Sequence, residues 1–279
     1  MVYDGKYPFP DRSACTNGDK TSEKILGAGA FNLDNFLIKR RLMGHGWLRV
    51  YDPAPLGGGN VSWCKWECTV EGPKSIKRLD MVSVNGAMGD VPPTLPVSTV
   101  SIKFKTVVSP KSHKLEIACV SAICHDRVIL DLASDESSKN MTALTLARPV
   151  NFDSNGTMTQ FPRDMEEGMK AMPELQKSPN ERALLSRLFA QIGTWDPNVL
   201  VSHNGVLVLH NGWCHDIDML LNRCVELKVS MWSKMGRRQR MRLPSNSHLG
   251  NGKDWVIEGA LYGRLLCDTK IGAKEFLGR

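Results

Sequence analysis

A basic segment near the C-terminal end of the chain has the residue types that bind phosphates. Its cationic and aromatic members include Trp232, Lys234, Arg237, Arg238 and Arg240, and few acidic residues lie near them. Guanidinium and ammonium groups spaced this closely can neutralise several phosphates of a nucleic acid, and an indole can stack on a base. The segment therefore predicts a DNA-contacting surface; the alternative is a solvated loop over a buried Trp232.

The overall composition agrees with a polyanionic partner. Lysine plus arginine number 36 against 29 aspartate plus glutamate, a net charge of +7, which suits a nucleic acid without proving one. Nowhere do eighteen apolar residues run together, so no membrane span is expected. The eight cysteines are scattered without a CxxC pair, mostly in apolar runs, and we expect reduced core thiols of an intracellular protein.

A zinc site is the other chemistry to weigh. His203, His210, Cys214 and His215 lie within thirteen residues of one another. A structural zinc ion needs four ligands in a regular pattern, and the chain offers neither a CxxC nor an HxxxH pair here. We therefore expect no metal site, and we interpret the histidines as hydrogen-bonded structural groups.

A predicted strand carries two lysines on one face. Apolar Val100, Ile102 and Phe104 alternate with polar positions that include Lys103 and Lys105. Because residues two apart on a strand project from the same side of a sheet, the two ammonium groups should share a face. Taken alone, this is an ordinary half-exposed strand whose lysine tips reach solvent.

Several elements must position these side chains. The strand over 98–104 should be followed by strands at 116–124 and 127–132, joined by a tight turn at His125-Asp126, and then by a strand at 142–148. Three neighbouring strands followed by helices indicate an antiparallel meander that leads into α/β units.

The next helix and strand have clear boundary signals. Asn180 should cap a helix with one apolar stripe that ends at Gly193, and a strand should follow over 198–202. Residues 151–180 are rich in turn formers and predict irregular structure, with a short helix over 165–172.

The N-terminal part has weaker signals. Residues 1–24 are polar and rich in turn formers, so we expect a poorly ordered lead-in. A short helix should begin at a cap on Asn32 and end at Gly44. Residues 47–51 and 61–70 predict a hairpin that turns over three glycines.

A series of short strings runs through the chain in a fixed order: VSWCK (61–65), ERALL (181–185), DP with VSHN (196–197 and 201–204), LLNR (220–223), MWSKMGRR (231–238), GRLLCD (263–268) and AKE (273–275). In this order they resemble the exonuclease-like region of the family B DNA polymerases, of the replicative alpha type. The resemblance covers roughly residues 25 to 279. The palm-domain motifs that carry the nucleotidyl-transfer aspartates do not occur, so we expect a piece of a longer polymerase that does not itself synthesise DNA.

The resemblance implies an α/β fold. Residues 80–279 should form a ribonuclease H-like 3′-to-5′ exonuclease-type domain with a mixed sheet, truncated before the third nuclease motif and the palm. Residues 1–79 should form a small α+β portion, the C-terminal part of the polymerase N-terminal domain.

Exonucleases of this kind hold two divalent metal ions with an Asp-x-Glu pair on the first strand and with later aspartates. The resemblance places Lys103 and Lys105 at the Asp-x-Glu positions and Asp216 in the second motif. Two unit charges about 4 Å apart interact by roughly 4 kcal/mol at an effective dielectric near 20, so each lysine would repel a divalent ion. We expect a degenerate site without catalytic residues or metal, in which Asp216 forms a salt bridge to Lys103 or Lys105.

The second motif also contains a local repeat. Residues 199–205 (VLVSHNG) are followed at once by 206–212 (VLVLHNG), with six of seven positions identical. The extra residues are β-prone, so we expect an extended segment at a sheet margin. Asp268, near a predicted strand end, is expected to be structural rather than catalytic.

By the same resemblance the parent protein is a nuclear DNA-directed DNA polymerase that extends primase-made primers and uses magnesium in its palm domain. Its partners would be DNA, the RNA–DNA primer-template, primase and accessory polymerase subunits. The present segment would act as scaffold and DNA-contacting surface. The alternative is an active metal-dependent 3′-to-5′ exonuclease. Because Lys103 and Lys105 are not carboxylates, such an enzyme would need metal-binding carboxylates from other positions of the chain.

Overall fold

The chain divides into two compact units. The first comprises Met1–Leu56 with Cys68–Thr94, and the second comprises Gly57–Glu67 with Leu95–Arg279. The predicted boundary between residues 79 and 80 differs from this division, because the first unit runs on to Thr94 and residues 57–67 join the second unit. The computed structural model describes residues 32–42, 46–57, 60–79, 83–84, 87–88, 95–110, 112–129, 140–152, 158–161, 164–203, 216–239, 241 and 259–278.

The described part of the first unit consists of a short helix and pairs of short strands. Helix α2 spans Asn32–Arg40, and strand β1 (Leu48–Val50) pairs antiparallel with β4 (Ile76–Arg78). The remaining elements are β2 (Ala54–Pro55) paired with β3 (Cys68–Thr69), β5 (Ser83–Val84) paired with β6 (Ala87–Met88), and the 3-10 helix η1 (Pro73–Ser75).

The hairpin predicted over 47–51 and 61–70 is wrong in its first strand, although Cys68–Thr69 of the predicted second strand does pair antiparallel with Ala54–Pro55. Strand β1 pairs with the later strand β4, and residues 61–67 belong to the second unit. A glycine-rich turn alone does not fix strand register, so a partner farther along the chain takes the place of the local one. The helix predicted from Asn32 is confirmed. It ends at Arg40 because Arg41 adopts a left-handed conformation with φ of 55°; the predicted end, Gly44, lies outside the described residues.

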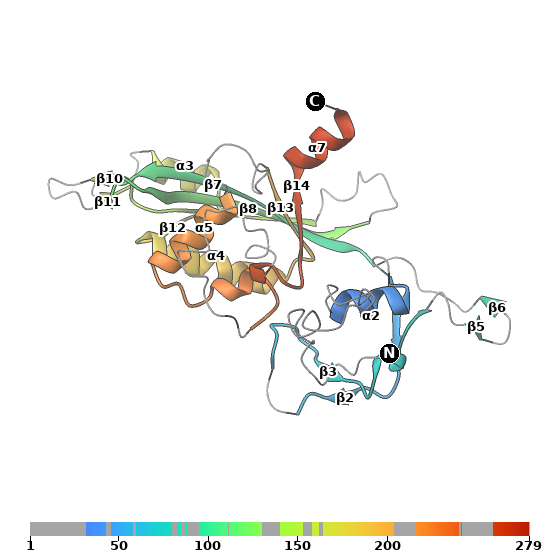
Figure 1. Ribbon diagram of the computed structural model, residues 1–279. Coiled ribbons are helices and arrows are strands. Elements are labelled where there is room, and N and C mark those ends of the chain that lie inside the picture. Colours follow the sequence, from blue (N-terminus) through green and yellow to red (C-terminus); the bar gives the residue numbers. More distant parts are fainter. Residues whose placement is uncertain are drawn as a thin grey trace, which may run out of the picture. The chain divides into compact units, whose positions relative to one another are not determined.

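A six-stranded mixed sheet forms the centre of the second unit (Figure 1), in the order β12-β9-β8-β7-β13-β14. Its antiparallel part is a meander, as predicted, of β7 (Val97–Val108), β8 (Leu115–Val128) and β9 (Met141–Ala147). Its third strand is β9 and not the strand predicted over 127–132. Parallel strands extend it on both sides: β12 (Leu175–Lys177) beside β9, then β13 (Val199–Ser202) beside β7, and β14 (Leu265–Asp268) beside β13. The α/β class with a mixed sheet is thereby confirmed.

The tight turn predicted at His125-Asp126 is wrong, because β8 runs through it as one strand. Its residues continue to pair with β7 there, His125 opposite Thr99 and Val128 opposite Val97. The ladder of the long partner strand outweighs the local turn preference of an Asp. Two further strands, β10 (Asn151–Phe152) and β11 (Met158–Gln160), form a small antiparallel pair in the stretch that was expected to be irregular.

Two helices cover one face of the sheet (Figure 1), namely α4 (Glu181–Trp195) and α5 (Asp216–Glu226). Asn180 caps α4 as predicted, since its side chain accepts a hydrogen bond from Ala183 N at 2.9 Å. The helix runs past Gly193 and ends where Asp196 takes a left-handed conformation. The core under these helices includes Val100, Ile102, Phe104, Val120, Leu146, Leu184, Leu188, Phe189, Ile192 and Leu220.

A buried ion cluster fixes α4 and α5 to the sheet. Arg223 of α5 donates to Glu181, the first residue of α4, at 2.8 and 2.5 Å. Glu181 also accepts from the backbone N of Ile117 on β8 at 2.8 Å. Arg148, which follows β9, pairs with Glu116 at 2.9 Å. Each buried charge has a partner, which is the condition for burying charges at tolerable cost.

The remaining elements of the second unit are short. Helix α3 (Met165–Ala171) confirms the predicted short helix, the 3-10 helix η4 covers Trp232–Met235, and α7 covers Thr269–Leu277. Among the described residues, no helix is long and apolar enough to cross a membrane.

Candidate functional site

The predicted ion pair between the first strand and the start of α5 is present. Lys103 Nζ lies 3.2 Å from Asp216 Oδ2. The lysine side chain is 56% exposed and the aspartate side chain 21%. Asp216 stands in the first turn of its helix, where the helix dipole favours a carboxylate. The two motifs predicted to be neighbours therefore meet, and their charges pair with each other.

The sheet topology explains why these residues meet. Strand β13 pairs with β7 through Ser101 and ends at Ser202. Lys103 therefore lies two residues beyond Ser101, on a part of β7 that does not pair with β13. The chain returns as α5, which begins at Asp216. The ends of parallel strands are where open α/β sheets gather functional side chains.

Lys105 is exposed on the same side of β7 as Lys103. Its cross-strand partner is Cys119 of β8. Burial raises the pKa of the Cys119 thiol, and the positive charge of Lys105 opposes that rise. Lys103 and Lys105 thus place two cations on one face of β7.

The described side chains around Lys103 do not fit a pair of divalent metal ions. Such ions prefer several oxygen ligands with negative charge, and Asp216 is already engaged by Lys103. Among the described residues, no group of three His, Cys, Asp or Glu side chains is placed to hold a metal ion. Residues 204–215, with His210, Cys214, His215 and most of the repeat, lie outside the described part of the chain, so the expected extended segment there is not described either.

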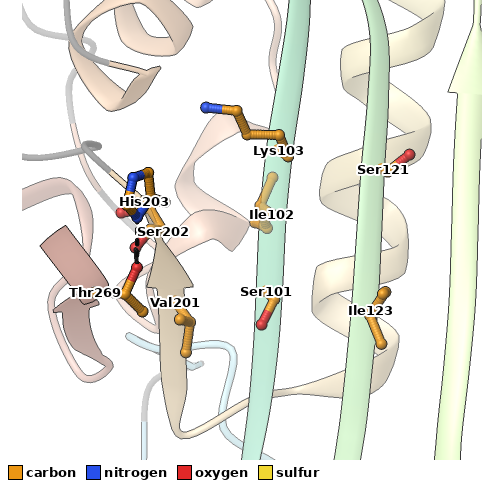
Figure 2. Close-up of a pocket in the computed structure, with 9 residues that line it drawn as sticks. All are labelled: Ser101, Ile102, Lys103, Ser121, Ile123, Val201, Ser202, His203 and Thr269. Atoms are coloured by element: carbon orange, nitrogen blue, oxygen red, sulfur yellow. Dashed lines mark hydrogen bonds between the residues drawn. The ribbon is translucent and has the colours of Figure 1, made fainter. Parts of the chain in front are cut away.

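A cavity of about 290 Å³ lies beside Lys103 (Figure 2). Strands β7 and β8 supply its floor, and the end of β13 and the start of α7 supply its wall. His203 Nδ1 lies 3.0 Å from Thr269 Oγ1, and this hydroxyl donates to Ser202 O at 3.2 Å. His203 is therefore a hydrogen-bonded structural group, as predicted. The lining residues are Ser101, Ile102, Lys103, Ser121, Ile123, Val201, Ser202, His203 and Thr269.

The basic segment is more deeply embedded than predicted. Trp232 is 4% exposed and packs in the main core, so base stacking by Trp232 is wrong and the alternative, a buried ring, holds. The apolar neighbour Met235 is 1% exposed. The ring is buried because η4 turns both side chains toward α4, with which it packs. Sequence alone did not show which face of this short helix points inward.

Arg237 is engaged inside the protein. Its Nε lies 3.0 Å from Asp196 Oδ1, and its Nη atoms donate to backbone oxygens of Gly263, Asp196 and Pro197 at 3.2 to 3.4 Å. Arg264 meets the same carboxylate at 2.8 Å and also donates to Met235 O at 3.1 Å. Burial lowers the pKa of Arg264, while Asp196 opposes that shift. One carboxylate thus holds two guanidinium groups that were not predicted to meet.

The outward members of the segment lie against residues 61–63. Arg238 is exposed and forms an isolated antiparallel bridge with Ser62. Lys234 Nζ lies 5.2 Å from the centre of the Trp63 ring, a cation–π contact. Arg240 lies outside the described residues. Of the predicted DNA-contact residues with described structure, Arg238 is the one that faces solvent freely.

Two further predictions concern single residues. Asp268 caps α7, because its carboxylate accepts from Lys270 N at 2.9 Å; this is a structural role, as expected. The expectation of core thiols holds for Cys124 and Cys224, which are buried, but is wrong for Cys68 and Cys267, which are exposed.

Comparisons with known proteins agree with this geometry. A model of the family described as "DNA polymerase family B, exonuclease domain" matches residues 30–277. The chain is 31% identical over 285 residues to the DNA polymerase alpha catalytic subunit of Arabidopsis thaliana, and 32% identical over 289 residues to that of Oryza sativa subsp. japonica; each alignment covers 97% of this chain and 18% of the relative. The subunit of Mus musculus is 30% identical over 259 residues, 92% of this chain and 16% of the relative. The chain therefore spans less than a fifth of the length of these relatives.

Proposed function

The chain belongs to the exonuclease-domain family of the family B DNA polymerases, and on that premise we propose that it is a non-catalytic exonuclease-like segment of an alpha-type replicative polymerase. Its named relatives are DNA polymerase alpha catalytic subunits, so the resemblance drawn from the short strings is confirmed. The segment acts as scaffold and DNA-contacting surface within a longer enzyme.

One observation supports the absence of nuclease chemistry. The ammonium group of Lys103 lies 3.2 Å from Asp216 Oδ2. A divalent ion at this carboxylate would have to displace the lysine and then bear its repulsion, about 4 kcal/mol for each unit of charge at 4 Å and an effective dielectric near 20. Lys105 adds a second cation on the same face. Two-metal hydrolysis needs a symmetric clamp of anionic ligands, and this face is positive instead.

The parent protein, on this proposal, is a nuclear DNA-directed DNA polymerase that extends primase-made primers. Its magnesium would belong to a palm domain, and its partners would be the RNA–DNA primer-template, primase and accessory subunits. The likeness to named polymerase alpha subunits supports these points. Residues 1–79, on the same grounds, represent the end of the polymerase N-terminal domain.

A nuclease assay tests the proposal. The 279-residue chain is incubated with 5′-labelled single-stranded DNA and either magnesium or manganese, and the products are resolved at single-nucleotide length. We expect the label to remain at full length over the whole time course. A ladder of products shortened from the 3′ end that EDTA abolishes would establish the alternative, an active metal-dependent 3′-to-5′ exonuclease.

A further inference from the structure

We propose that residues 61–67, here named the Trp66 loop, form with Arg238 a binding surface for single-stranded nucleic acid, on which one base stacks against Trp66. The proposal rests on the DNA-contacting role proposed above and assigns that role to residues outside the basic segment. The aromatic partner is Trp66, since Trp232 is buried.

Trp66 is the starting observation. Its side chain is 84% exposed, whereas Trp232 is 4% exposed and Trp63 is 37% exposed. An indole left in water forgoes roughly 25 cal/mol for each Å² of apolar surface that burial would remove. An exposed indole of this kind can serve as a platform on which a base stacks. Lys65 Nζ lies 5.9 Å from the centre of the Trp66 ring, so a positive charge lies next to the exposed indole.

The loop that carries Trp66 is closed by its own carboxylate. Glu67 accepts hydrogen bonds from Val61 N at 3.1 Å, from Ser62 N at 2.6 Å and from the Ser62 hydroxyl. The Ser62 hydroxyl is the main cause that lowers the pKa of Glu67, with the two backbone N–H groups acting in the same direction. The loop's one acidic side chain thus faces the loop backbone, and Lys65 and Trp66 are left at its outer side.

The loop is attached to the basic segment by backbone pairing. Trp63 N donates to Arg237 O at 2.7 Å, and Gln239 N donates to Val61 O at 3.0 Å. Ser62 and Arg238 stand opposite each other in this short antiparallel pairing. Because side chains of directly opposed residues lie close together, the pairing places the exposed guanidinium of Arg238 beside the loop.

The chemistry of the surface selects the ligand. Lys65 and Arg238 can neutralise phosphates, and Trp66 offers a flat face to a base; aromatic platforms flanked by cations are how single strands are bound without sequence preference. Bases inside a duplex are already stacked on one another, so an unpaired base is required. Protein–protein interfaces are depleted in lysine but enriched in tryptophan and arginine, so a protein contact of Trp66 is one outcome of the test below.

Binding of a fluorescein-labelled oligothymidylate to the full 279-residue chain, followed by anisotropy, tests the proposal. Trp66→Ala should weaken binding roughly ten-fold, which is a typical loss for one stacked base, and should leave the salt dependence unchanged. Trp66→Phe should recover most of the affinity. The logarithm of the binding constant falls linearly with the logarithm of the salt concentration. Arg238→Gln should make this slope less steep by about 0.7, which corresponds to the loss of one phosphate contact on a single strand.

Matched controls separate stacking from general effects. Leu277→Ala removes another exposed apolar side chain, 72% exposed, and should bind like the unaltered chain. Thermal unfolding of each variant checks that the fold is intact. If Trp66→Ala does not fold, Trp66→Phe and Trp66→Leu are compared instead, and of these two variants only Trp66→Phe should bind tightly.

The outcomes distinguish the two levels of the proposal. If the unaltered chain does not bind the oligonucleotide at all, the DNA-contacting function fails, and the Trp66 surface with it. If the unaltered chain binds and Trp66→Ala binds equally well, the Trp66 surface alone is overturned. Unchanged DNA binding with lost self-association in light scattering would assign Trp66 to a protein contact, which also overturns the proposal.

Discussion

Lys103 and Asp216 are separated by 113 positions in the chain, yet Lys103 Nζ lies 3.2 Å from Asp216 Oδ2. The fold thus brings the first strand of the sheet and the start of α5 together, and their opposite charges pair. On the proposed function, Lys103 stands where an active nuclease would hold a metal ion with carboxylates.

Restoring carboxylates on β7 should create a metal site. In the double variant Lys103→Asp with Lys105→Glu, two carboxylates would lie on one face of β7, one of them at the position that now pairs with Asp216, and oxygen ligands of this kind bind divalent ions. Isothermal calorimetry with manganese should show saturable binding that the unaltered chain lacks. The control Lys103→Ala with Lys105→Ala removes the positive charges without adding ligands and should show none; equal binding by both variants would contradict this account.

Arg264→Lys should destabilise the protein by about 2 to 3 kcal/mol. The Arg264 side chain is 1% exposed and donates both to Asp196 and to the backbone oxygens of Met235 and Pro197. A lysine cannot span all three acceptors, and each buried acceptor left without a donor costs about 1 to 3 kcal/mol. Urea unfolding followed by tryptophan fluorescence measures the change. Arg182→Lys, at an exposed position of α4, is the control and should change little.

Two glycine-to-alanine changes should have opposite signs. A Cβ at Gly236 would lie 2.6 Å from Ala260 O, a backbone atom, so Gly236→Ala should cost about 1 to 3 kcal/mol through overpacking. A Cβ at Gly272, inside α7, would meet nothing within 4 Å. Gly272→Ala should therefore stabilise by about 0.5 to 1 kcal/mol. Paired thermal melts check both, and a stable Gly236→Ala protein would show that the described close approach is wrong.

Cysteine reactivity should follow burial and pKa. Burial raises the pKa of the Cys224 thiol to about 12, so at pH 8 its thiolate fraction is on the order of one in ten thousand. Among the cysteines that the structure describes, Cys68 and Cys267 are exposed and should react with Ellman's reagent before Cys224. Raising the pH to 10 should still leave Cys224 protonated, because its pKa lies above the solution pH. Mass spectrometry of the modified peptides gives the order, and early labelling of Cys224 would contradict it.

Local signals were enough for part of the fold. Asn180 at a helix start predicted α4, because a side-chain oxygen at that position satisfies a free backbone N–H of the first turn. The meander was predicted from alternation along β7, which has one face in the core. The meeting of Lys103 with Asp216 came from family resemblance, since neither residue carries a local signal for the other.

Features that depend on distant partners were not predicted. Strand β8 continues through His125-Asp126 because β7 pairs with it there, and no local pattern reports the length of a partner strand. Arg264 and Asp196 are 68 positions apart, so no local sequence pattern predicts that they form an ion pair. The burial of Trp232 and the exposure of Trp66 depend on which helix and which loop each indole faces, and the residue type is the same at both positions.

The most direct measurement of the central claim is a titration of the unaltered chain with manganese, followed by the electron paramagnetic resonance signal of the free ion. Because Lys103 pairs with Asp216 and Lys105 adds a second positive charge on the same face of β7, no manganese should bind. The free-ion signal should therefore rise in proportion to the manganese added, as it does in buffer. A saturable loss of that signal that Asp216→Asn abolishes would show a divalent ion held by this carboxylate and would contradict the account.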